Sequence, residues 1–471
     1  MNIIKVKSFA DEYGRAEWGA ISAIDGRNSQ SVNSLRPFVS EYGLVKYRAM
    51  VEAAWVLKLV EVLPDVPPLS AKSKKALQIV ASGKSFSVND MAAVKAKELT
   101  TNHDIKALEL VLRENFVNDG LLNNHLELIH FGVTSDDIKN LAEALSLRDA
   151  RSKVLLPAIN DVILDITKKS KSWSNIAILG HTHGQPATPT TLGKEFAIFV
   201  NRLKRAQNNF ADSPILGKLN GATGGYNAMS VVYPDVNWPD VAKNFVQSLG
   251  LQFNELTTQI EPHDWVAEYL HRFEETLYPM LDLSKDCWLY ISYNYLSQIA
   301  ISSEVGSSTM PHKVNPISFE NAEANFETSI TLADGLAKKL TQSRLQRDLS
   351  DSSAKRVIGV SLAYGLVAIS SLKVGLSKIT PNKMVIKNDL NNHWEVLTEP
   401  VQQFLRRYNI SGGYDLTKKA SRGTTFTKLD YANLLKSIKP LLPKSAYPGL
   451  EQLKKLTPET YIGYSQKLVN L

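Results

Sequence analysis

The sequence has few residues that cross-link a chain or interrupt its helices. Among 471 residues there is one cysteine, Cys287, which excludes a disulfide within the chain and a zinc site built from several cysteines. Glycine and proline number 25 and 20, fewer than the usual combined share of about 12%. Because both residues are poor helix formers, their scarcity favours long helices.

Long hydrophobic runs are also lacking. The N-terminal segment, residues 1–15, has no apolar core of signal-peptide length. The longest uncharged apolar stretch covers residues 357–372, which falls short of the roughly 18 residues that a membrane span needs. Together with the single cysteine, these absences predict a cytoplasmic protein with no membrane partner.

The chain is moderately basic, with 54 lysines and arginines against 47 aspartates and glutamates and a formal net charge of +7. Such a surplus is compatible with a nucleic acid or with a small anionic substrate. The basic residues are scattered, however, and no basic run with interleaved aromatic residues occurs. The pattern therefore argues against a nucleic-acid partner.

Apolar residues recur with helical spacing along most of the chain. Two long examples run from Phe196 to Phe210 and from Leu277 to Tyr295. Alternating strand-like runs are rare, and neither a Walker A motif nor a dinucleotide-binding glycine pattern occurs. We therefore predict an all-α fold.

Composition separates three zones, which we predict to be three helical domains. The first covers residues 1–124 and ends in a polar stretch. The second, residues 125–375, carries the longest helical patterns and suits a bundle of long helices. The third, residues 376–471, contains shorter segments broken by glycine and proline. No low-complexity linker marks the boundaries.

Most of the nine histidines lie in short polar segments. A lone histidine is more often structural than catalytic, but several histidines with hydroxyl, amide and carboxylate neighbours indicate one polar pocket. His181 and His183 could form half of a metal site, yet no further cluster has ligand spacing, so we predict no metal. The polar segments are residues 101–104, 129–137, 181–189, 259–264 and 306–316.

The segment 306–316 has the most distinctive chemistry. Gly306 and the two serines after it form a loop whose backbone amides could hold an anion, while Lys313 adds a cation and Asn315 an amide. This combination is too unusual for a plain surface loop. The segment, GSSTMPHKVNP, resembles the signature of the fumarase/aspartase superfamily, whose members eliminate fumarate from succinyl-bearing substrates.

Other segments resemble one family within that superfamily. Residues 100–104, 181–189, 257–264 and 344–356 are similar to the adenylosuccinate lyase family in its longer bacterial-type form. The resemblance extends from Asp25 to about Gly463, nearly the whole chain. Argininosuccinate lyase, fumarase and aspartase share the signature. They do not need the arginine-rich segment 344–356, which holds a nucleotide phosphate in adenylosuccinate lyases.

The resemblance implies a base and an acid for the elimination. The base corresponds to Ser307, and the general acid corresponds to His183, whose ring would face Glu320. A serine base needs a closed loop that excludes water and stabilises the alkoxide. Lys313 and Asn315 are suited to hold the doubly charged carbanion intermediate, by the logic of an oxyanion hole.

The resemblance also assigns the substrate contacts. It places the succinyl group at Thr134 and Ser135, where residues 134–137 also have the pattern of a helix capping box. Asn28 replaces the tyrosine that is usual in the family, and its amide could substitute in a phosphate contact. The phosphate is assigned to Arg27, Arg347, Ser352 and Arg356. The remaining matched contacts are Asn102, His103, Asp104, His130, Gln259, Ser308, Val314, Asn315, Asn321, Ser353, Ala354 and Lys355.

The protein implied by this resemblance is a homotetrameric lyase. In the superfamily the central bundles pack into a twenty-helix core, and each site takes segments from three subunits. The implied reactions are cleavage of adenylosuccinate to AMP and fumarate, and of SAICAR to AICAR and fumarate, without a metal or organic cofactor. Two alternatives stay open. One is another fumarate-releasing lyase such as argininosuccinate lyase, and the other is a non-catalytic structural protein on the same fold, like the lens crystallins.

Overall fold

The computed structural model describes residues 19–122, 124–299, 310, 312–423 and 425–470, which form two compact units. Unit 1 comprises Met1–Ile159, Ala206–Tyr278 and Ala324–Ser370. Unit 2 comprises Asn160–Arg205, Pro279–Glu323 and Ser371–Leu471. The division into three domains stays a prediction.

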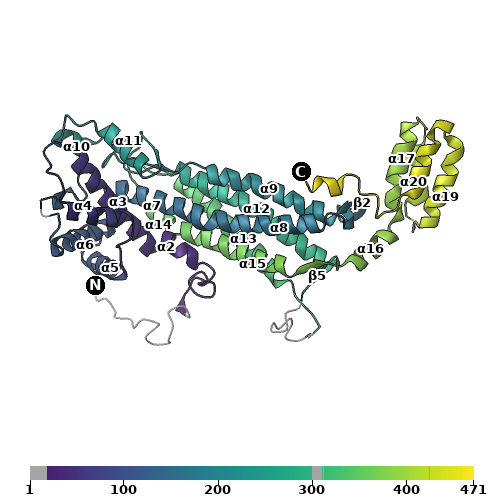
Figure 1. Cartoon of the computed structure of the whole chain (residues 1–471), viewed down its shortest axis with the longest axis horizontal. Coiled ribbons are helices and arrows are strands. Elements are labelled where there is room, and N and C mark those ends of the chain that lie inside the picture. The colour runs from purple at the N-terminus through teal and green to yellow at the C-terminus, as the bar shows by residue number, and fades with distance from the viewer. Residues whose placement is uncertain (1–18, 123, 300–309, 311, 424, 471) are drawn as a thin grey trace. The chain divides into compact units, whose positions relative to one another are not determined.

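Helices make up nearly all of the regular structure, so the predicted all-α fold is confirmed. In the described residues the strands form just three two-stranded sheets. Five long helices contribute residues to both units (Figure 1): α8 (Leu156–Ser172), α9 (Leu192–Asp212), α12 (Asp264–Ser292), α13 (Ile317–Leu340) and α15 (Ile358–Ser377).

Unit 1 contains the other α-helices that precede residue 250 and one short helix near residue 350. The helices are α2 (Arg36–Val39), α3 (Glu41–Val62), α4 (Ala71–Ala81), α5 (Val88–Thr101), α6 (Asp104–Asn118), α7 (Ser135–Ala150), α10 (Asn227–Val232), α11 (Trp238–Ser248) and α14 (Ser350–Lys355). The strands β3 (Leu216–Gly217) and β4 (Gln252–Phe253) pair in parallel.

The core of unit 1 forms around α3. This helix begins after Ser40, whose side chain accepts a hydrogen bond from the Gly43 amide at 3.1 Å. It packs against both α4 and α7. Its fully buried Trp55 contacts the rings of Trp238 and Phe245, with centroids 6.5 Å and 5.1 Å away. The packing fixes which residues of α3 face α7.

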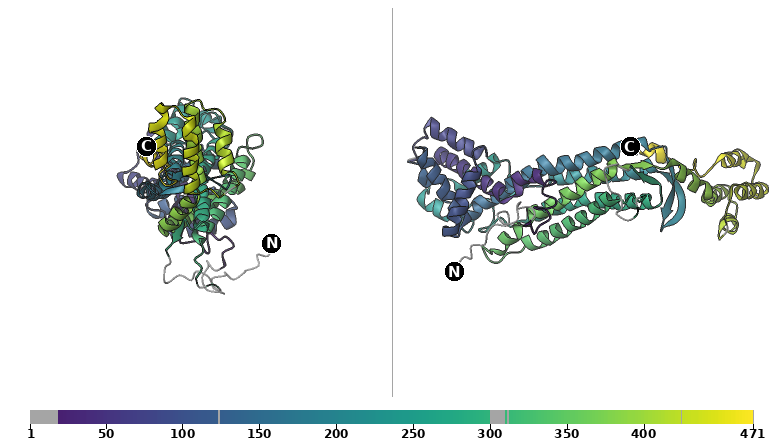
Figure 2. Two further views of the ribbon diagram at one scale, coloured as in Figure 1. Left: turned by 90° about the vertical axis from the view of Figure 1, so that its right-hand side faces the viewer. Right: turned by 90° about the horizontal axis from the view of Figure 1, so that it is seen from below.

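Unit 2 contains a β-hairpin and the C-terminal helices. β1 (Ala177–Thr182) pairs antiparallel with β2 (Gln185–Thr191), and β5 (Leu296–Gln298) pairs antiparallel with β6 (Ile379–Pro381). Helices α17, α19 and α20 lie side by side (Figures 1 and 2). The C-terminal helices are α16 (Lys383–Asn392), α17 (Thr398–Arg407), α18 (Gly413–Ser421), α19 (Lys428–Ile438), α20 (Tyr447–Lys455) and α21 (Ser465–Leu468).

One predicted helical face is confirmed and the other is partly wrong. Phe196 and Phe210 on α9 are both buried, as the spacing predicts. On α12, however, Trp288 is 39% exposed, and the helix ends at Ser292 rather than continuing to Tyr295. Asn294 has a φ of 58°, a left-handed conformation that a helix cannot continue through.

The apolar stretch 357–372 lies mainly in α15. By length and composition alone, the segment Ser350–Ser377 is apolar enough to cross a membrane, but 56% of its most apolar window is buried inside the protein. The core helix of a soluble protein has the same properties. Leu362, Leu372 and Leu376 are fully buried, as in such a core helix.

Candidate active site

The predicted general acid, His183, lies at the tip of the β1–β2 hairpin in unit 2. Thr182 pairs with Gln185, so His183 and Gly184 form a two-residue turn. Their φ angles are 54° and 72°, as a type I′ turn requires at both positions. Glycine adopts this conformation freely, whereas histidine does so at a steric cost. The turn presents an exposed imidazole.

The hairpin is anchored on both sides of this tip. Thr188 on β2 donates a hydrogen bond from its hydroxyl to Glu399 at the start of α17. Thr190 donates to Glu195 on α9 at 2.8 Å. The ring of His181 stacks on Tyr293, with centroids 5.3 Å apart and planes 28° apart. These contacts hold the strands while His183 remains accessible.

The predicted pairing of His183 with Glu320 is not made among the described residues of one chain. Glu320, in the first turn of α13, accepts a hydrogen bond from the Trp288 indole at 3.2 Å. His183 makes no hydrogen bond or ion pair with any described residue. Both side chains are exposed. The pairing therefore stays a prediction that a second copy of the chain could satisfy.

The predicted base lies outside the described residues, as does Ser308. The end of the signature segment is described and precedes α13. Lys313 and Val314 are exposed there, and the Val314 carbonyl accepts a hydrogen bond from the Gln298 side chain at 2.9 Å. Asn315 is half-buried and Asn321 is exposed.

In unit 1, the start of α7 is held by a buried carboxylate. Asp137 is fully buried, and it accepts hydrogen bonds from the amides of Thr134, Asn220 and Gly221 at 2.8, 3.0 and 3.1 Å. The ammonium of Lys218, also fully buried, lies 2.8 Å from it. The capping role that the sequence predicts is confirmed. Thr134, at the helix N-cap, remains half-exposed.

The segment Asn102–Asp104 forms the joint between α5 and α6. Asn102 ends α5 in a left-handed conformation with φ of 50°, and His103 caps α6 by accepting a hydrogen bond from the Lys106 amide at 3.1 Å. The other ring nitrogen of His103 lies 3.5 Å from the Ser135 hydroxyl. Two segments that the sequence assigns to the substrate site are thus adjacent.

His130 is held by a carboxylate that sequence motifs do not mark. Its Nδ1 lies 2.6 Å from Glu52 on α3, and its amide donates to the same carboxylate at 3.1 Å. Glu52 is buried. Burial would lower the pKa of His130, but the hydrogen bond and charge of Glu52 raise it above the ordinary value.

We expect Glu52→Gln to reduce thermal stability most strongly at mildly acidic pH. The pKa of His130 is higher in the folded state than in the unfolded state. The His130–Glu52 pair therefore makes its full contribution to the free energy of unfolding below about pH 6.5, the ordinary pKa of histidine. This contribution is lost as the pH rises through the folded-state pKa. The difference in melting temperature between wild type and variant should therefore narrow as the pH increases. Glu61→Gln, an exposed position on the same helix, is the control. A difference that is constant with pH would contradict the assignment.

The arginine-rich segment folds around α14. Arg347 donates to Asp136 on α7 at 3.1 Å and to Asp351 at 2.9 Å. Buried His263 lies 3.1 Å from Asp351. Burial would raise the pKa of Asp351, but hydrogen bonding to His263 and the charges of Lys355 and Arg347 hold it well below its usual range. The backbone amide of Gln259 donates to the Gln346 carbonyl at 3.3 Å.

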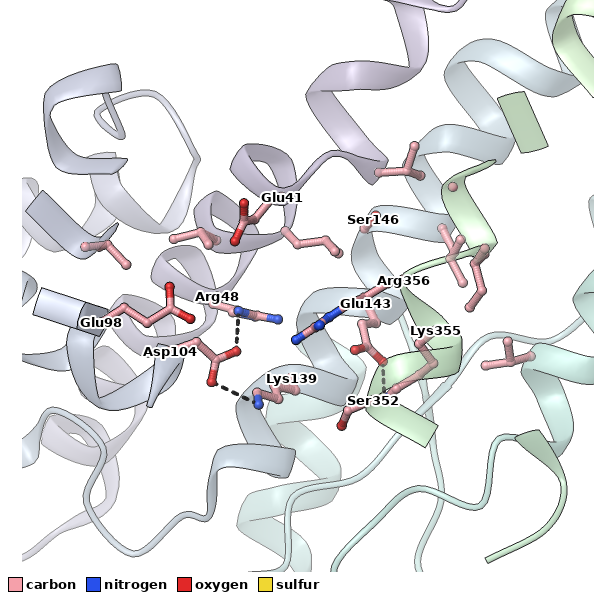
Figure 3. Close-up of a pocket in the computed structure, with 18 of the residues that line it drawn as sticks. Glu41, Arg48, Glu98, Asp104, Lys139, Glu143, Ser146, Ser352, Lys355 and Arg356 are labelled. Carbon is pink, nitrogen blue, oxygen red and sulfur yellow. Dashed lines mark hydrogen bonds and ion pairs between the residues drawn. The ribbon is translucent and has the colours of Figure 1, made fainter. Parts of the chain in front are cut away.

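A cavity of about 600 Å³ in unit 1 collects part of the predicted substrate site (Figure 3). Of the predicted residues, Asp104, Ser352, Lys355 and Arg356 line it. Arg27 is exposed in the turns before α2, and neither Arg27 nor Asn28 is among the described residues that line this cavity. Among the described residues no group of histidine, cysteine and carboxylate side chains is placed to hold a metal ion.

Sequence motifs miss two cationic residues of this cavity. Arg48 on α3 and Lys139 on α7 each lie 3.0 Å from the Asp104 carboxylate. Burial would raise the pKa of Asp104, but these two charges lower it below its ordinary value. One signal in the sequence could have marked α3: Arg48 and Glu52 are charged residues one helical turn apart in a mostly apolar segment.

Comparison with known proteins identifies the family. A family model described as "Lyase" matches residues 26–326, and one described as "Adenylosuccinate lyase C-terminal" matches residues 343–462. The adenylosuccinate lyase of Legionella pneumophila (strain Corby) is 46% identical over 453 residues, covering 96% of this chain and 98% of the relative. That of Escherichia coli (strain K12) is 42% identical over 455 residues, covering 96% and 98%.

A solved structure supports the fold independently. The fumarate lyase from Mesorhizobium sp. BNC1 superposes with a TM-score of 0.72 over 93% of this chain and 96% of the other, at 17% sequence identity. This likeness concerns the fold alone. The family models and the sequence relatives, in contrast, show that the chain is a lyase and belongs to the adenylosuccinate lyase family of the fumarase/aspartase superfamily.

Proposed function

We propose that this chain eliminates fumarate from adenylosuccinate, giving AMP, and from SAICAR, giving AICAR. The observation that carries the proposal is the cavity of unit 1, where Ser352 and Arg356 lie across from Asp104. A hydroxyl and a guanidinium that forms no ion pair with a described residue suit a phosphate group. Argininosuccinate has no phosphate, so this chemistry favours a nucleotide over that rival substrate.

The elimination divides between a base and an acid. Ser307, as an alkoxide, removes the proton from the carbon next to a carboxylate, and the electron pair left behind is delocalised into that carboxylate. The carbon–nitrogen bond then breaks and the carbon–carbon double bond of fumarate forms. His183 donates the proton that the departing nitrogen needs. Its place at an exposed hairpin tip supports this role, since the imidazole can reach a ligand that its own strands do not contact.

The start of α7 supports the proposed succinyl site. Thr134 and Ser135 are at the N-terminal end of a helix, where free amides and the helix dipole favour a carboxylate. The buried Lys218–Asp137 pair fixes this end without neutralising its exposed face. Lys313, Asn315 and the amides of the signature segment would stabilise the charge that develops on the carboxylate during the reaction. We assign Glu320 to orient the imidazole of His183.

We further propose a cytoplasmic homotetramer whose sites are shared between subunits. Within the described part of a single chain, the His183 and Glu320 side chains make no contact with one another. Large apolar side chains are also exposed on the long helices of unit 2: Leu164 on α8, Ile198 on α9, Trp288 and Leu289 on α12, and Val374 on α15. Exposed apolar surface of this kind is typical of an interface between subunits. A twenty-helix core would cover it.

The function is tested by mixing the purified protein with adenylosuccinate and following absorbance, since loss of the succinyl group changes the purine chromophore. We expect turnover that survives exhaustive chelation and gel filtration, because the proposed proton transfers need only side chains of the protein. Argininosuccinate serves as the alternative substrate and should not be cleaved. Activity lost on chelation and restored by one divalent metal would make His181 and His183 candidate ligands. Turnover of neither substrate would favour the structural alternative.

A further inference from the structure

The β1–β2 hairpin of unit 2 carries His183 at its tip, and its orientation depends on what its strands contact. A two-stranded hairpin is only marginally stable by itself. Here β1 packs against α16, and β2 packs against the short helix Trp394–Leu397 and against α21. The C-terminal elements of the chain therefore support the hairpin.

On β1 the support meets the strand where its pairing is interrupted. The register between β1 and β2 shifts between Ile178 and Gly180, so Leu179 has no partner in the ladder. Leu179 is buried, and its backbone amide is hydrogen-bonded to the phenol oxygen of Tyr295. Tyr295 thus replaces the partner that β2 does not provide.

Tyr295 is itself held by two helices. Its amide donates to the Tyr290 carbonyl of α12 at 2.9 Å, and its carbonyl accepts from the amide of Asn382, the N-cap of α16, at 2.8 Å. Its hydroxyl donates to Asp389 on α16. Burial and this hydrogen bond raise the pKa of the Tyr295 phenol, so the proton that Asp389 accepts is retained. The side chain is buried and connects α16 to β1.

On β2 the support is a carboxylate that two hydroxyl groups share. Thr188 donates to Glu399 on α17, and the hydroxyl of Tyr461 is hydrogen-bonded to the same carboxylate. Glu399 thus joins β2 to the C-terminal segment that follows α20. The stacking of His181 on Tyr293 is a weaker support, because the Tyr293 ring is 43% exposed.

Both supports lie some distance from the tip of the hairpin. Leu179 precedes His183 by four residues, and Thr188 follows it by five. At a rise of about 3.3 Å per residue, four residues place the tip about 13 Å beyond the supports, so a tilt of about 5° moves it by about 1 Å. A displacement of that size at a reacting group can lower a rate by about 100-fold. The position of the imidazole is therefore sensitive to both supports.

We propose that Tyr295 and Glu399 are positioning residues that hold the His183 imidazole in place for proton transfer to the leaving nitrogen. Each acts through the hairpin and does not touch the substrate. The inference rests on the proposed function, in which His183 is the general acid. It goes beyond that function by assigning the placement of the acid to residues outside the hairpin. Glu320 orients the ring, whereas Tyr295 and Glu399 fix the backbone that carries it.

Tyr295→Phe tests the support on β1, because it removes the phenol oxygen and keeps the ring. We expect kcat for adenylosuccinate to fall by a factor of about 10 to 100, while KM changes by no more than about twofold. Asp389→Asn keeps an acceptor for the hydroxyl and should retain most of the activity, whereas Asp389→Leu should lose as much as Tyr295→Phe.

Tyr431→Phe is the matched control. The Tyr431 side chain is also buried in unit 2, and its hydroxyl donates to the Leu453 carbonyl at 2.8 Å. This hydrogen bond connects α19 to α20 and not to the hairpin. We expect kcat of the control to stay within about twofold of the wild-type value.

Combining variants separates positioning from a general structural role. In a His183→Asn background, Tyr295→Phe should change kcat by no more than about twofold, because no acid remains to be misplaced. Glu399→Ala should show the same dependence on background. It removes an exposed side chain, so it also tests the proposal if Tyr295→Phe fails to fold.

Losses of equal size with and without His183 would overturn the inference. So would unchanged kcat in Tyr295→Phe and Glu399→Ala when the wild type cleaves adenylosuccinate, and the proposed function would then stand. A wild-type protein that does not cleave adenylosuccinate would contradict the proposed function and this inference with it.

Hydrogen exchange provides a measurement that does not depend on turnover. Exchange of the β1 amides, followed by mass spectrometry on peptides that cover Ala177–Thr182, should be faster in Tyr295→Phe than in the wild type. Tyr431→Phe should leave it unchanged. Unchanged exchange in folded Tyr295→Phe would show that Tyr295 does not hold the strand, and the inference would be wrong.

Discussion

Replacing His183 by asparagine is expected to lower turnover by a factor of about 10² to 10⁴, because the change removes proton transfer to the leaving nitrogen. Asparagine is the suitable replacement here. His183 has a φ of 54° in the hairpin turn, and asparagine tolerates that conformation better than alanine does. The variant should therefore keep its hairpin and assembly. Steady-state turnover of adenylosuccinate, with circular dichroism and native mass spectrometry as checks, measures the effect.

His181→Asn provides the matched control. His181 lies on the same hairpin and is also exposed, but its ring stacks on Tyr293. We expect this variant to retain most of its turnover, since stacking contributes to the anchoring of the hairpin and not to proton transfer. If His183→Asn stays within a few-fold of wild type, the acid is another residue. His130 and His103 are then the next candidates, because both lie near the start of α7 in unit 1.

Motifs in the sequence locate the segments that carry chemistry, because those segments depend on residue type and local spacing. Thr134 and Asp137 are recognisable as a helix start from their order alone, and the structure confirms this. The left-handed turn at His183 and Gly184 has a weaker local signal. A histidine in that conformation is uncommon, and the short β1–β2 hairpin around it is not apparent in a sequence dominated by helical spacing.

Residues that act through tertiary packing could not be located in the same way. Arg48 reaches Asp104 because α3 packs on α6, and nothing in the local sequence fixes which turn of one helix faces the other. The role of Arg347 could not be predicted from the sequence for the same reason. Its sequence position suggests a phosphate contact, whereas its carboxylate partners, Asp136 and Asp351, are apparent only once α7 and α14 are adjacent.

The charged residues of unit 1 show why the family pattern is informative yet incomplete. A motif specifies side chains that meet the ligand, but each of these needs partners that keep it oriented and charged when the ligand is absent. His130 has Glu52 and Asp104 has Arg48 and Lys139. These partners lie on neighbouring helices, where any residue of suitable charge and length could serve. They are therefore specified by the fold rather than by a short sequence pattern.

Two inactive variants are expected to restore activity when they form mixed tetramers. If the acid and the base of one site come from different subunits, a mixture of His183→Asn and Ser307→Ala chains can assemble some sites with both groups intact. Each group has an even chance of coming from an intact chain, so random assembly of a closed tetramer gives both groups in at most about a quarter of the sites. Activity should approach that fraction of the wild-type value. Mild dissociation and reassociation of the purified variants prepares the mixture.

The separate variants, taken through the same dissociation, are the controls, and each should stay inactive. A mixture of His183→Asn with Glu320→Gln adds a second test, because the exposed His183 and Glu320 make no contact with one another within the described part of a single chain. If Glu320 orients the imidazole across a subunit boundary, this pair of variants should also complement. If native mass spectrometry confirms mixed tetramers and they remain inactive, the acid and the base lie on one chain. The shared-site architecture would then be wrong, although each residue could still have the chemical role that we assign to it.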